Sequence, residues 1–566
     1  MFNRFRCFFS TTIVAISLNV LPYPAGSEIP ADVLEAISET IEAYCESNVL
    51  VGASWLVVKD RRQVIQRTYG WSDREAKVPM DSETVFNIRS MTKMLTGAAI
   101  QILIDEGILR PEDHAAEYLP GFDRPSSRDI TVKQLLTHRC GLPLSILTAL
   151  DNYDNLISMG NAIGRRGPQF TPGSKFWYSD SGTDTLGAII EVATGQSLVE
   201  FVRERLLDPL DMHDTYYPSE PGWPTQRVAS LYYGGTGAWT RIWTPEEPFY
   251  PYAWGSQSLY STPSDYMKFL AMLLDDGVAN GNRILSMAAV RRILTPVSIM
   301  SSLGSDETFP TGFAGQQSRY GQMAVLYETE DGVVDSFGHS GSDGTWAWAW
   351  PDHDLMICFF TQSRGQATGI RLESDFDALL FGGRGEPDAS MVEKYGRYCG
   401  LYQASFDSLL GSFNQQQFTV VIQNGRLGID IPGFYIIGLK DPGRGGAWYL
   451  DLGNELHVRF ETNEVGDVTG LRFYEPQKVF RLPRKSFGEE EARFLRVERL
   501  TGSGDTDFTT ILSGAPGSQY RIERSPNLRN WNTWKTVLQP QFYLHIRDLN
   551  PERSDNQFYR ALFLSN

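Results

Sequence analysis

The sequence predicts an α+β protein built from several domains, and three observations support this prediction. At 566 residues the chain is too long for one ordinary domain, so we expect two to four. Helical and strand patterns alternate along the first part of the chain. Beyond about Glu386 the pattern changes to short strands separated by turns, which is typical of small all-β domains.

Composition and charge exclude several classes of partner. Hydrophobic residues make up 42% of the chain and aromatic residues 12%, which is enough for sizeable packed cores. The formal net charge of -17 opposes binding to nucleic acid or to an anionic membrane surface, because both need basic patches. We therefore expect a soluble, acidic, globular protein.

The first 27 residues have the pattern of an export signal. Arg4 and Arg6 provide a positive start, an apolar stretch runs to Leu21, and Ala25-Gly26-Ser27 offers small residues for cleavage. The apolar stretch is shorter than the roughly 20 residues that a membrane helix needs. We expect cleavage of residues 1–27, a secreted or periplasmic protein and no membrane insertion after cleavage; an uncleaved anchor is the alternative.

The cysteines and one histidine give no sign of a metal site. Four cysteines remain after residue 27, at Cys45, Cys140, Cys358 and Cys399. They are widely spaced, form no C-x-x-C pair and assign no disulfide. His353 lies between two aspartates, but a solvated hairpin turn explains it better than a metal cluster, because no second histidine stands at ligand spacing.

The first elements along the chain are a short helix and a hairpin. Residues 33–44 have a helical pattern, and 52–59 and 63–69 are β-rich stretches separated by Asp60-Arg61-Arg62. A buried amphipathic helix is expected within 86–109, with apolar residues at helical spacing and Gly107 as its stop.

This second helix carries the first catalytic candidates. Ser90 would open it, and Lys93 would lie one turn away on the same face. A lysine buried there can take the proton of a serine hydroxyl if its pKa falls from about 10.4. The alternative is a helix start with a solvated lysine. The S-x-x-K pattern alone is weak, since it occurs by chance in most chains of this length.

Two further segments offer polar candidates beside helices. Residues 129–143 have the pattern of a capped helix, and His138 in its last turn is more often a cap or packed side chain than a catalytic base. Tyr178-Ser179-Asp180 lies in the turn before a helix marked by Leu186 to Ala193. A tyrosine there can point its hydroxyl into a cleft, although a locally bonded core tyrosine is the alternative.

The rest of this part combines an aromatic loop with scaffold elements. Residues 215–254 have little regular pattern and many aromatic side chains, and we expect one or two of these to line a substrate pocket. A capping box at 262–265 starts a helix, and 346–350 and 355–361 predict two strands joined by a turn. Further on, Asn424-Gly425 is a strong hairpin signal, and a charged linker at 483–493 leads to a last β-rich unit.

Three motifs stand in order along the chain: Ser90-Met91-Thr92-Lys93, Tyr178-Ser179-Asp180 and His339-Ser340-Gly341. With LLTHRCGLP and SLYSTPSDYMKFLAMLL, they make residues 30–380 resemble the serine β-lactamase-related family. That family includes class C β-lactamases, D-Ala-D-Ala carboxypeptidases, D-aminopeptidases and family VIII esterases. Five ordered matches are specific in a way that no single one is. The resemblance implies an antiparallel sheet flanked by helices beside an all-helical subdomain, with the cleft between them.

The resemblance also implies roles for individual residues. Ser90 would be the acylated nucleophile, Lys93 its activating partner, and Tyr178 the acid/base that passes the proton to the leaving group. Backbone N–H groups of Ser90 and Ser342 would form the oxyanion hole. The expected substrate-binding set is Asp180, His339, Gly341 and Ser342. The resemblance implies neither a metal nor a cofactor.

The tail is similar to known modules on looser patterns. Tyr398 to Tyr402 and the strands after it resemble a lipocalin-like β-domain, and the last unit resembles β-sandwich modules of secreted bacterial proteins. The expected domains are a signal peptide at 1–27, a hydrolase domain at 28–385, a lipocalin-like β-domain at 386–484 and a β-sandwich-like domain at 494–566. A surface or a polymer is the candidate partner of the C-terminal domain. Truncation after about Arg384 should leave a folded catalytic body.

The leading hypothesis is a secreted serine hydrolase that cleaves an ester or amide/peptide bond of a small-molecule or peptide substrate through a Ser90 acyl-enzyme. The alternative is a catalytically silent binding or sensor module of the penicillin-recognising type. The joint presence of nucleophile, lysine and tyrosine favours an enzyme. Esterase or peptidase activity is favoured over β-lactamase activity, because Asp180 and His339 replace the asparagine and lysine of the lactamase motifs, although Arg364 could restore some positive charge.

Overall fold

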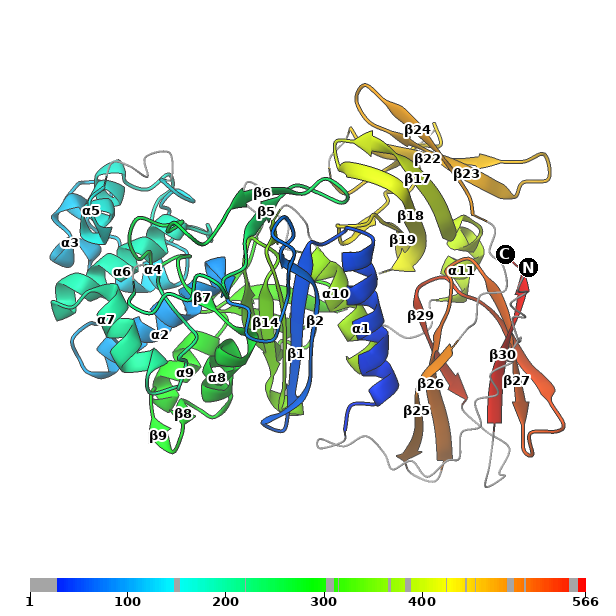
Figure 1. Ribbon diagram of the computed structural model, residues 1–566, viewed down its shortest axis with the longest axis horizontal. Helices are drawn as coiled ribbons and strands as arrows, with labels where there is room; N and C mark the ends of the chain where they lie inside the picture. Colours follow the sequence, from blue (N-terminus) through cyan, green and yellow to red (C-terminus); the bar gives the residue numbers. More distant parts are fainter. Residues whose placement is uncertain are drawn as a thin grey trace, which may run out of the picture.

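The computed structural model describes residues 28–146, 153–218, 220–301, 310–313, 315–364, 368–381, 388–423, 425–442, 445–452, 455–485, 493–502, 505–548 and 558–565. The predicted export signal therefore lies outside the described residues. Figure 1 shows a helical region on one side of a central sheet, and two β-rich regions beyond the other side. The α+β class predicted from the sequence is confirmed.

A nine-stranded sheet forms the centre of the molecule, with the order β10-β11-β12-β13-β14-β15-β1-β2-β3. Its longer strands pair antiparallel, and β1 lies between its hairpin partner β2 and the late strand β15, with Ala53 opposite Thr361. The predicted N-terminal hairpin and the predicted late strand pair are both present. The strands are β1 (Gly52–Lys59), β2 (Arg62–Asp73), β3 (Val78–Pro79), β10 (Ser298–Ile299), β11 (Gln316–Tyr320), β12 (Val325–Thr329), β13 (Val334–Ser340), β14 (Trp346–Trp350) and β15 (Leu355–Thr361).

Helices cover both faces of this sheet. In β14 the three tryptophans belong to the buried cluster that α1 and α10 share, whereas Ala347 and Ala349 belong to the cluster around α2 and α8. This division follows from the two-residue period of a strand. The large rings fill one face, and the small alanines let α8 approach the other. The helices on the sheet are α1 (Ala31–Glu46), α8 (Pro263–Leu274), α10 (Thr368–Phe376) and the π-helical η6 (Asp377–Phe381), whereas α2 (Thr92–Asp105) lies within the helical region (Figure 1).

The helical region lies to one side of the sheet (Figure 1). It consists of α3 (Ala115–Tyr118), η2 (Pro120–Phe122), α4 (Val132–Leu136), α5 (Leu156–Arg166), α6 (Asp180–Thr194), α7 (Leu198–Val202), the π-helical η4 (Arg203–Leu207) and α9 (Met287–Leu294), with the short strands β8 (Val278–Ala279) and β9 (Asn282–Arg283). Within the described residues no single helix is long and apolar enough to cross a membrane. The pair 180–194 and 198–207 passes that test only jointly and bends by 87°.

Two local predictions need correction. Ser90 does not open the α-helix, because the chain passes from β4 (Phe86–Asn87) into a 3-10 turn, η1 (Arg89–Met91), and α2 begins at Thr92. The helix predicted over 129–143 is only five residues long, α4. His138 lies after it with a φ of 51°, a left-handed backbone that ends helical geometry.

The segment after α11 (Ala389–Tyr395) and η7 (Gly396–Tyr398) forms an eight-stranded meander. Two four-stranded sheets, β17-β18-β19-β20 and β21-β22-β23-β24, share one buried cluster. Isolated bridges between Leu439 and Leu450 and between Tyr402 and Arg484 join the two sheets at both ends, so we call this unit the barrel. Its strands are β17 (Gly400–Ser408), β18 (Gly411–Gln423), β19 (Arg426–Asp430), β20 (Ile436–Gly438), β21 (Trp448–Tyr449), β22 (His457–Thr462), β23 (Val468–Tyr474) and β24 (Val479–Pro483).

The last unit contains two three-stranded sheets, β25-β26-β29 and β28-β27-β30, around a small apolar cluster. Its strands are β25 (Arg493–Gly502), β26 (Asp505–Ser513), β27 (Gln519–Ser525), β28 (Asn532–Leu538), β29 (Tyr543–Asp548) and β30 (Phe558–Ser565). The strand content agrees with two C-terminal β units. The predicted domain boundaries stay predictions, since 382–387 and 486–492 lie outside the described residues.

Contacts between the last unit and α1 oppose the expectation that the tail can be removed freely. Leu495 and Ile511 belong to the same buried cluster as Val33 of α1 and Trp55 of β1. Arg493 also forms an ion pair with Glu39 at 2.6 Å. Truncation after about Arg384 would expose apolar side chains of the central body to water, which lowers its stability.

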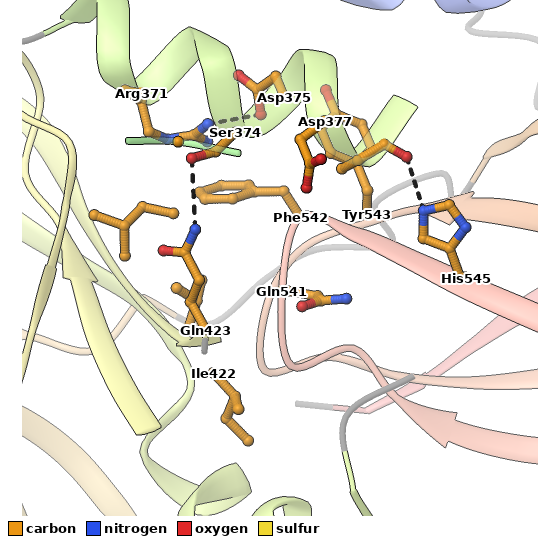
Figure 2. A pocket seen from close by; sticks show the side chains of 14 residues that line it. Arg371, Ser374, Asp375, Asp377, Ile422, Gln423, Gln541, Phe542, Tyr543 and His545 are labelled. Atoms are coloured by element: carbon orange, nitrogen blue, oxygen red, sulfur yellow. Dashed lines mark hydrogen bonds and ion pairs between the residues drawn. The ribbon is translucent and has the colours of Figure 1, made fainter. Parts of the chain in front are cut away.

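A small cavity of about 80 Å³ lies where the central body, the barrel and the last unit meet. Figure 2 shows Arg371 and Asp375 of α10 at the top of the view, with Phe542 of the last unit directly below them and His545 of the same unit at the right. Arg371 donates to Asp375 at 2.6 Å and to Asp430 of β19 at 3.0 Å, and its guanidinium lies 4.6 Å from the Phe542 ring. His545 is bonded to the Ala378 carbonyl oxygen at 2.7 Å. We call Arg371, Asp375 and Asp430 the junction cluster.

A ribbon from the aromatic loop connects the body to the barrel. Strands β5 (Leu231–Tyr233) and β6 (Thr240–Trp243) pair with each other, and β5 also pairs with β16 (Ser363–Arg364), while β7 (Tyr260–Ser261) pairs with β4. At the ribbon tip, Thr236 Oγ1 donates to the Pro432 carbonyl oxygen at 2.7 Å, and Ser412 N donates to the Thr236 carbonyl oxygen at 3.1 Å. The ribbon therefore ends on the barrel, not in solvent.

Candidate active site

The first two catalytic candidates are in hydrogen-bond contact. Ser90 is the middle residue of η1, and Lys93 is the second residue of α2, so the short 3-10 turn sets their spacing. Lys93 Nζ donates to Ser90 Oγ at 3.1 Å and to the Ser256 carbonyl oxygen at 2.9 Å. The Lys93 side chain is wholly buried, while Ser90 is partly exposed. Within this pair only the serine meets solvent.

Asp180 is the third member of this group. Ser179 caps α6 by accepting from Gly182 N at 2.9 Å, which places Asp180 at the first helical position. Its carboxylate lies 2.6 Å from Lys93 Nζ. Burial alone would lower the pKa of Lys93, but the charge of Asp180 and the nearby Tyr178 outweigh burial and hold that pKa above its usual value. Lys93 is therefore an ammonium at neutral pH.

Tyr178 lies on the other side of the capping residue and faces the same lysine. The Lys93 ammonium is 5.0 Å from the centre of the Tyr178 ring. Burial raises the pKa of Tyr178, while the charge of Lys93 and hydrogen bonds with Ser90 and Lys93 partly offset that rise. The structure thus brings Ser90, Lys93, Tyr178 and Asp180 together, as the resemblance implied.

Asp184 is a site residue that the sequence reasoning missed. One turn beyond Asp180 on α6, it is 5% exposed and accepts from Ser256 N at 2.9 Å. Burial raises the pKa of Asp184 to about 7, and the charge of Asp180 adds to that rise. Because the Ser256 carbonyl accepts from Lys93, Asp184 holds the loop that anchors the lysine. The i, i+4 spacing of the two aspartates was the available signal.

Two buried histidines, His138 and His339, border the tyrosine, and burial keeps both rings neutral at neutral pH. The His138 ring lies 4.4 Å from the Tyr178 ring, and its Nδ1 accepts from Ser179 N at 3.3 Å, so this residue packs and orients, as favoured from the sequence. Burial holds the pKa of His138 well below its usual value. Burial and the charge of Lys93 lower the pKa of His339 to about 3.

His339 is less accessible than a substrate-binding residue should be. It is 2% exposed, its Nδ1 is bonded to the Ser340 carbonyl oxygen at 2.7 Å, and its Nε2 lies 3.4 Å from the Tyr320 hydroxyl. Gly341 N donates to the Thr345 carbonyl oxygen at 2.7 Å, while Ser342 is exposed at the top of that turn. Of these three predicted binding residues, Ser342 is the one that solvent reaches freely.

A buried ion pair joins the segment of the first motif, Ser90 to Lys93, to the turn that follows the third motif, His339 to Gly341. Arg89 Nε donates to Asp343 Oδ2 at 2.6 Å, and both side chains are almost fully buried. Arg364 of β16 lies 3.7 Å from the other oxygen of Asp343, so the charge that could have replaced a lysine in the third motif faces this aspartate. Sequence reasoning did not select Arg89 or Asp343, although each is next to a predicted oxyanion-hole residue.

No metal site is built from the described residues. Among them, no group of three or more histidine, cysteine, aspartate or glutamate side chains could hold a metal ion, and Cys45, Cys140, Cys358 and Cys399 are free thiols. The arrangement offers instead a partly exposed hydroxyl beside a buried ammonium and a phenol. Such a group of side chains is suited to nucleophilic attack on a carbonyl carbon.

Comparison with known proteins adds a family to this geometry. The family model named Beta-lactamase matches residues 37–380. An uncharacterized protein of Mycobacterium tuberculosis (strain CDC 1551 / Oshkosh) is 29% identical over 363 residues, which cover 58% of this chain and 90% of that protein. Penicillin-binding protein 4 of Amycolatopsis lactamdurans is 30% identical over 282 residues, which cover 48% of this chain and 69% of that protein.

Solved structures share the fold at low identity. The octameric penicillin-binding protein homologue from Pyrococcus abyssi aligns with a TM-score of 0.55 and 22% identity, over 79% of this chain and 99% of that chain. The hydrolase EstCE1, with promiscuous acyltransferase activity, aligns with a TM-score of 0.52 and 17% identity, over 62% of this chain and 98% of that chain. At these identities the likeness concerns the fold alone.

Proposed function

The chain belongs to the beta-lactamase family, and from this premise we propose that it is a serine hydrolase that cleaves an ester or amide bond through an acyl-enzyme on Ser90. The observation that carries the proposal is the hydrogen bond from the buried Lys93 ammonium to Ser90 Oγ, with Asp180 at 2.6 Å from the same nitrogen. A structural serine at a helix start does not require a wholly buried lysine beside it, since burying an ammonium is costly without a role or a partner.

In this mechanism Tyr178 carries the proton. Tyr178 in its phenolate form, which burial disfavours and the Lys93 charge favours, takes the hydroxyl proton of Ser90 while Oγ attacks the carbonyl carbon. The neutral phenol then returns the proton to the leaving alkoxide or amine, and the acyl group stays on Ser90. In the second half, Tyr178 takes a proton from water, and the hydroxide oxygen displaces Ser90, which recovers its proton. Lys93 remains an ammonium throughout because Asp180 holds its pKa high.

The same geometry favours esters or peptides over β-lactams as substrates. Asp180 is an acceptor that Lys93 already occupies, so it cannot donate a hydrogen bond to the side-chain amide of a penicillin. His339 is buried and neutral, so it supplies no positive charge to a drug carboxylate. Each lost contact of this kind costs roughly 1 to 3 kcal/mol.

The first experiment is labelling of the purified protein with a fluorophosphonate, followed by mapping of the modified peptide. An adduct on Ser90 is expected, and its absence would favour the silent binding or sensor module. The second experiment compares kcat/KM for a p-nitrophenyl ester and for a cephalosporin, with the ester expected to be the better substrate. Faster cephalosporin hydrolysis would show that Asp180 and His339 do not select against β-lactams.

The proposal includes export to the periplasm or the medium, with loss of residues 1–27, and contact of the last unit with a surface or polymer. The basic start, apolar stretch and small residues at 25–27 support export. Mass spectrometry of the N-terminus of the protein recovered outside the cytoplasm tests this part. An intact residue 1 in the exported protein would favour the uncleaved anchor.

A further inference from the structure

The residue before the nucleophile and the residue after Ser342 are joined directly. Arg89 Nε and Asp343 Oδ2 are 2.6 Å apart, with side chains 2% and 1% exposed. Ser90 and Ser342 come from different parts of the chain, η1 and the turn after β13. The ion pair therefore connects, at adjoining residues, the two segments that the proposed mechanism must hold in register.

The arginine side of this connection is strongly fixed. Arg89 has a φ of 47°, which is unfavourable for a residue with a side chain and persists only where the surroundings hold it. Its backbone N donates to Asn87 Oδ1 at 3.0 Å, its Nη1 donates to the Tyr250 hydroxyl at 2.5 Å, and the Phe249 ring lies 4.5 Å from the guanidinium. Arg89 is thus held at its backbone N and at two guanidinium nitrogens, Nε and Nη1.

The aspartate side is a tight turn that lies directly against the first segment. Gly341 N donates to the Thr345 carbonyl oxygen at 2.7 Å, and Gly344 N donates to the Gly341 carbonyl oxygen at 3.0 Å. A Cβ added at Gly341 would meet the Ile88 carbonyl oxygen at 2.6 Å. The turn can approach the nucleophile segment this closely only because residue 341 has no side chain.

We infer that the Arg89–Asp343 ion pair sets the spacing between the backbone N–H groups of Ser90 and Ser342, and so positions the oxyanion hole of this enzyme. The inference rests on the proposed function and assigns two positioning residues that do not touch the substrate. Both donors must reach the same developing oxyanion within about 2.7 to 3.1 Å, so a relative shift of their segments weakens transition-state binding. A displacement of about 1 Å can cost on the order of 100-fold in rate.

The test compares matched substitutions at two buried Arg–Asp pairs. Asp343→Asn removes the charge beside the site, and Asp375→Asn removes the charge in the junction cluster, where the ion pair has the same 2.6 Å length and a 3% exposed aspartate. Asp343→Asn should lower kcat for a p-nitrophenyl ester by about 30-fold or more with KM within threefold, because only the transition state loses contacts. Asp375→Asn should leave both constants within about twofold.

A transition-state mimic separates positioning from general damage. The tetrahedral adduct of a boronic acid with Ser90 places an oxygen in the oxyanion hole, so its affinity should fall by the same factor as kcat/KM. Arg89→Lys, which keeps the charge, should retain more activity than Arg89→Met. If a single substitution prevents folding, Arg89→Met combined with Asp343→Leu removes both buried charges and can restore stability.

The outcomes distinguish failure of this inference from failure of the proposed function. The inference fails if the folded double variant hydrolyses the ester and binds the boronic acid as the wild-type protein does. It also fails if Asp375→Asn loses as much kcat as Asp343→Asn at equal loss of thermal stability. If the wild-type protein forms no fluorophosphonate adduct on Ser90, the proposed function itself fails.

Discussion

Arg89 and Arg371 are both buried arginines that donate to an aspartate at 2.6 Å, yet they join different parts of the molecule. The Arg89–Asp343 pair links two turns inside the central body, each next to a predicted oxyanion-hole residue. The junction cluster links α10 to β19 of the barrel through Asp430. The Phe542 ring of the last unit lies against Arg371 in this cluster (Figure 2). The same kind of ion pair therefore lies beside the proposed reaction centre at one place and at the junction with the β units at the other.

The difference shows that a buried charge is not by itself a sign of a functional site. What distinguishes the Arg89 pair is its neighbours in the chain. Ser90 opens the first motif, Ser342 directly follows the third, and solvent reaches both residues. Arg371 is instead covered by Phe542, and its donors are used by two carboxylates. Four substitutions test this division between a reactive region and a structural region.

The largest effect is expected for the nucleophile. Ser90→Ala should lower kcat/KM for a p-nitrophenyl ester by about 10⁴-fold or more, because no other group can form the acyl-enzyme. Its melting temperature should stay close to that of the wild-type protein. Ser54→Ala is the matched control, since Ser54 is a buried serine of β1 whose hydroxyl has no hydrogen-bond partner among the described residues. Residual turnover in Ser90→Ala above this limit would show that another residue is the nucleophile.

The junction cluster should act on stability instead of rate. Arg371→Met leaves Asp375 and Asp430 without their cation, which should lower the free energy of unfolding by roughly 3 to 5 kcal/mol. Denaturant titration gives this value, and activity per folded molecule should change less than twofold. Arg371→Lys should lose less stability. A large fall in kcat in folded Arg371→Met would mean that the junction cluster acts on the reaction, and would contradict a purely structural role for it.

Asp184 lies in the reactive region but also affects stability, and the pH dependence of unfolding isolates its effect on stability. Because burial raises its pKa from 3.8 to about 7, the folded protein keeps a proton that the unfolded chain loses above about pH 4. Its stabilising contribution is present below that pH and is lost as the pH rises to about 7. This loss of unfolding free energy amounts to roughly 2 to 4 kcal/mol between pH 4 and 8. Asp184→Asn should remove it, as measured by unfolding titrations across this pH range.

Glu373 provides the control for that experiment. Burial also raises its pKa to about 7, and it accepts hydrogen bonds from Gly312 N and Trp348 Nε1 without contacting the catalytic group. Glu373→Gln should therefore reduce the same pH slope of stability and leave kcat unchanged. Equal slopes in the wild-type protein and in both variants would contradict the raised pKa values.

The smallest expected effect is a shift of the pH–rate profile. In the wild-type protein kcat/KM should rise with pH as Tyr178 ionises, since Lys93 stays charged. In Asp180→Asn burial of Lys93 is no longer offset by a carboxylate, so a neutral amine becomes available at lower pH. The rising limb should move to lower pH by at least about one unit, which corresponds to about 1.4 kcal/mol. Asp123→Asn, an exposed carboxylate far from α6 in sequence, should leave the limb unchanged.

Much of the reactive region could be predicted because its residues lie in short motifs. The spacing of Ser90 and Lys93 is local, and Tyr178 and Asp180 flank a helix cap. The resemblance to the serine β-lactamase-related family then implied that these two local motifs meet. Asp343 and Arg89 are 254 positions apart, and no local pattern reports that they meet. The contact depends on how β13 and η1 lie in the folded body.

The structural region could be predicted less well, for a physical reason. Hairpin signals indicated strands in the tail, but the bridges that close the barrel and the burial of Leu495 against α1 are tertiary contacts. Helix 129–143 was predicted too long because the left-handed backbone of His138 overrides helical propensity there. Local periodicity is informative only where local contacts decide the conformation.

The ribbon formed by β5 and β6 limits how this chain can be recombined with its relatives. Its root lies beside β16, which carries Arg364, and its tip is bonded to Pro432 and Ser412 of the barrel. A chimera that takes the barrel from another member of the family would replace the acceptor of Thr236 and the Asp430 partner of Arg371 together. Crossovers that move residues 231–243 along with the barrel, and keep an acidic residue at 430, should preserve both contacts.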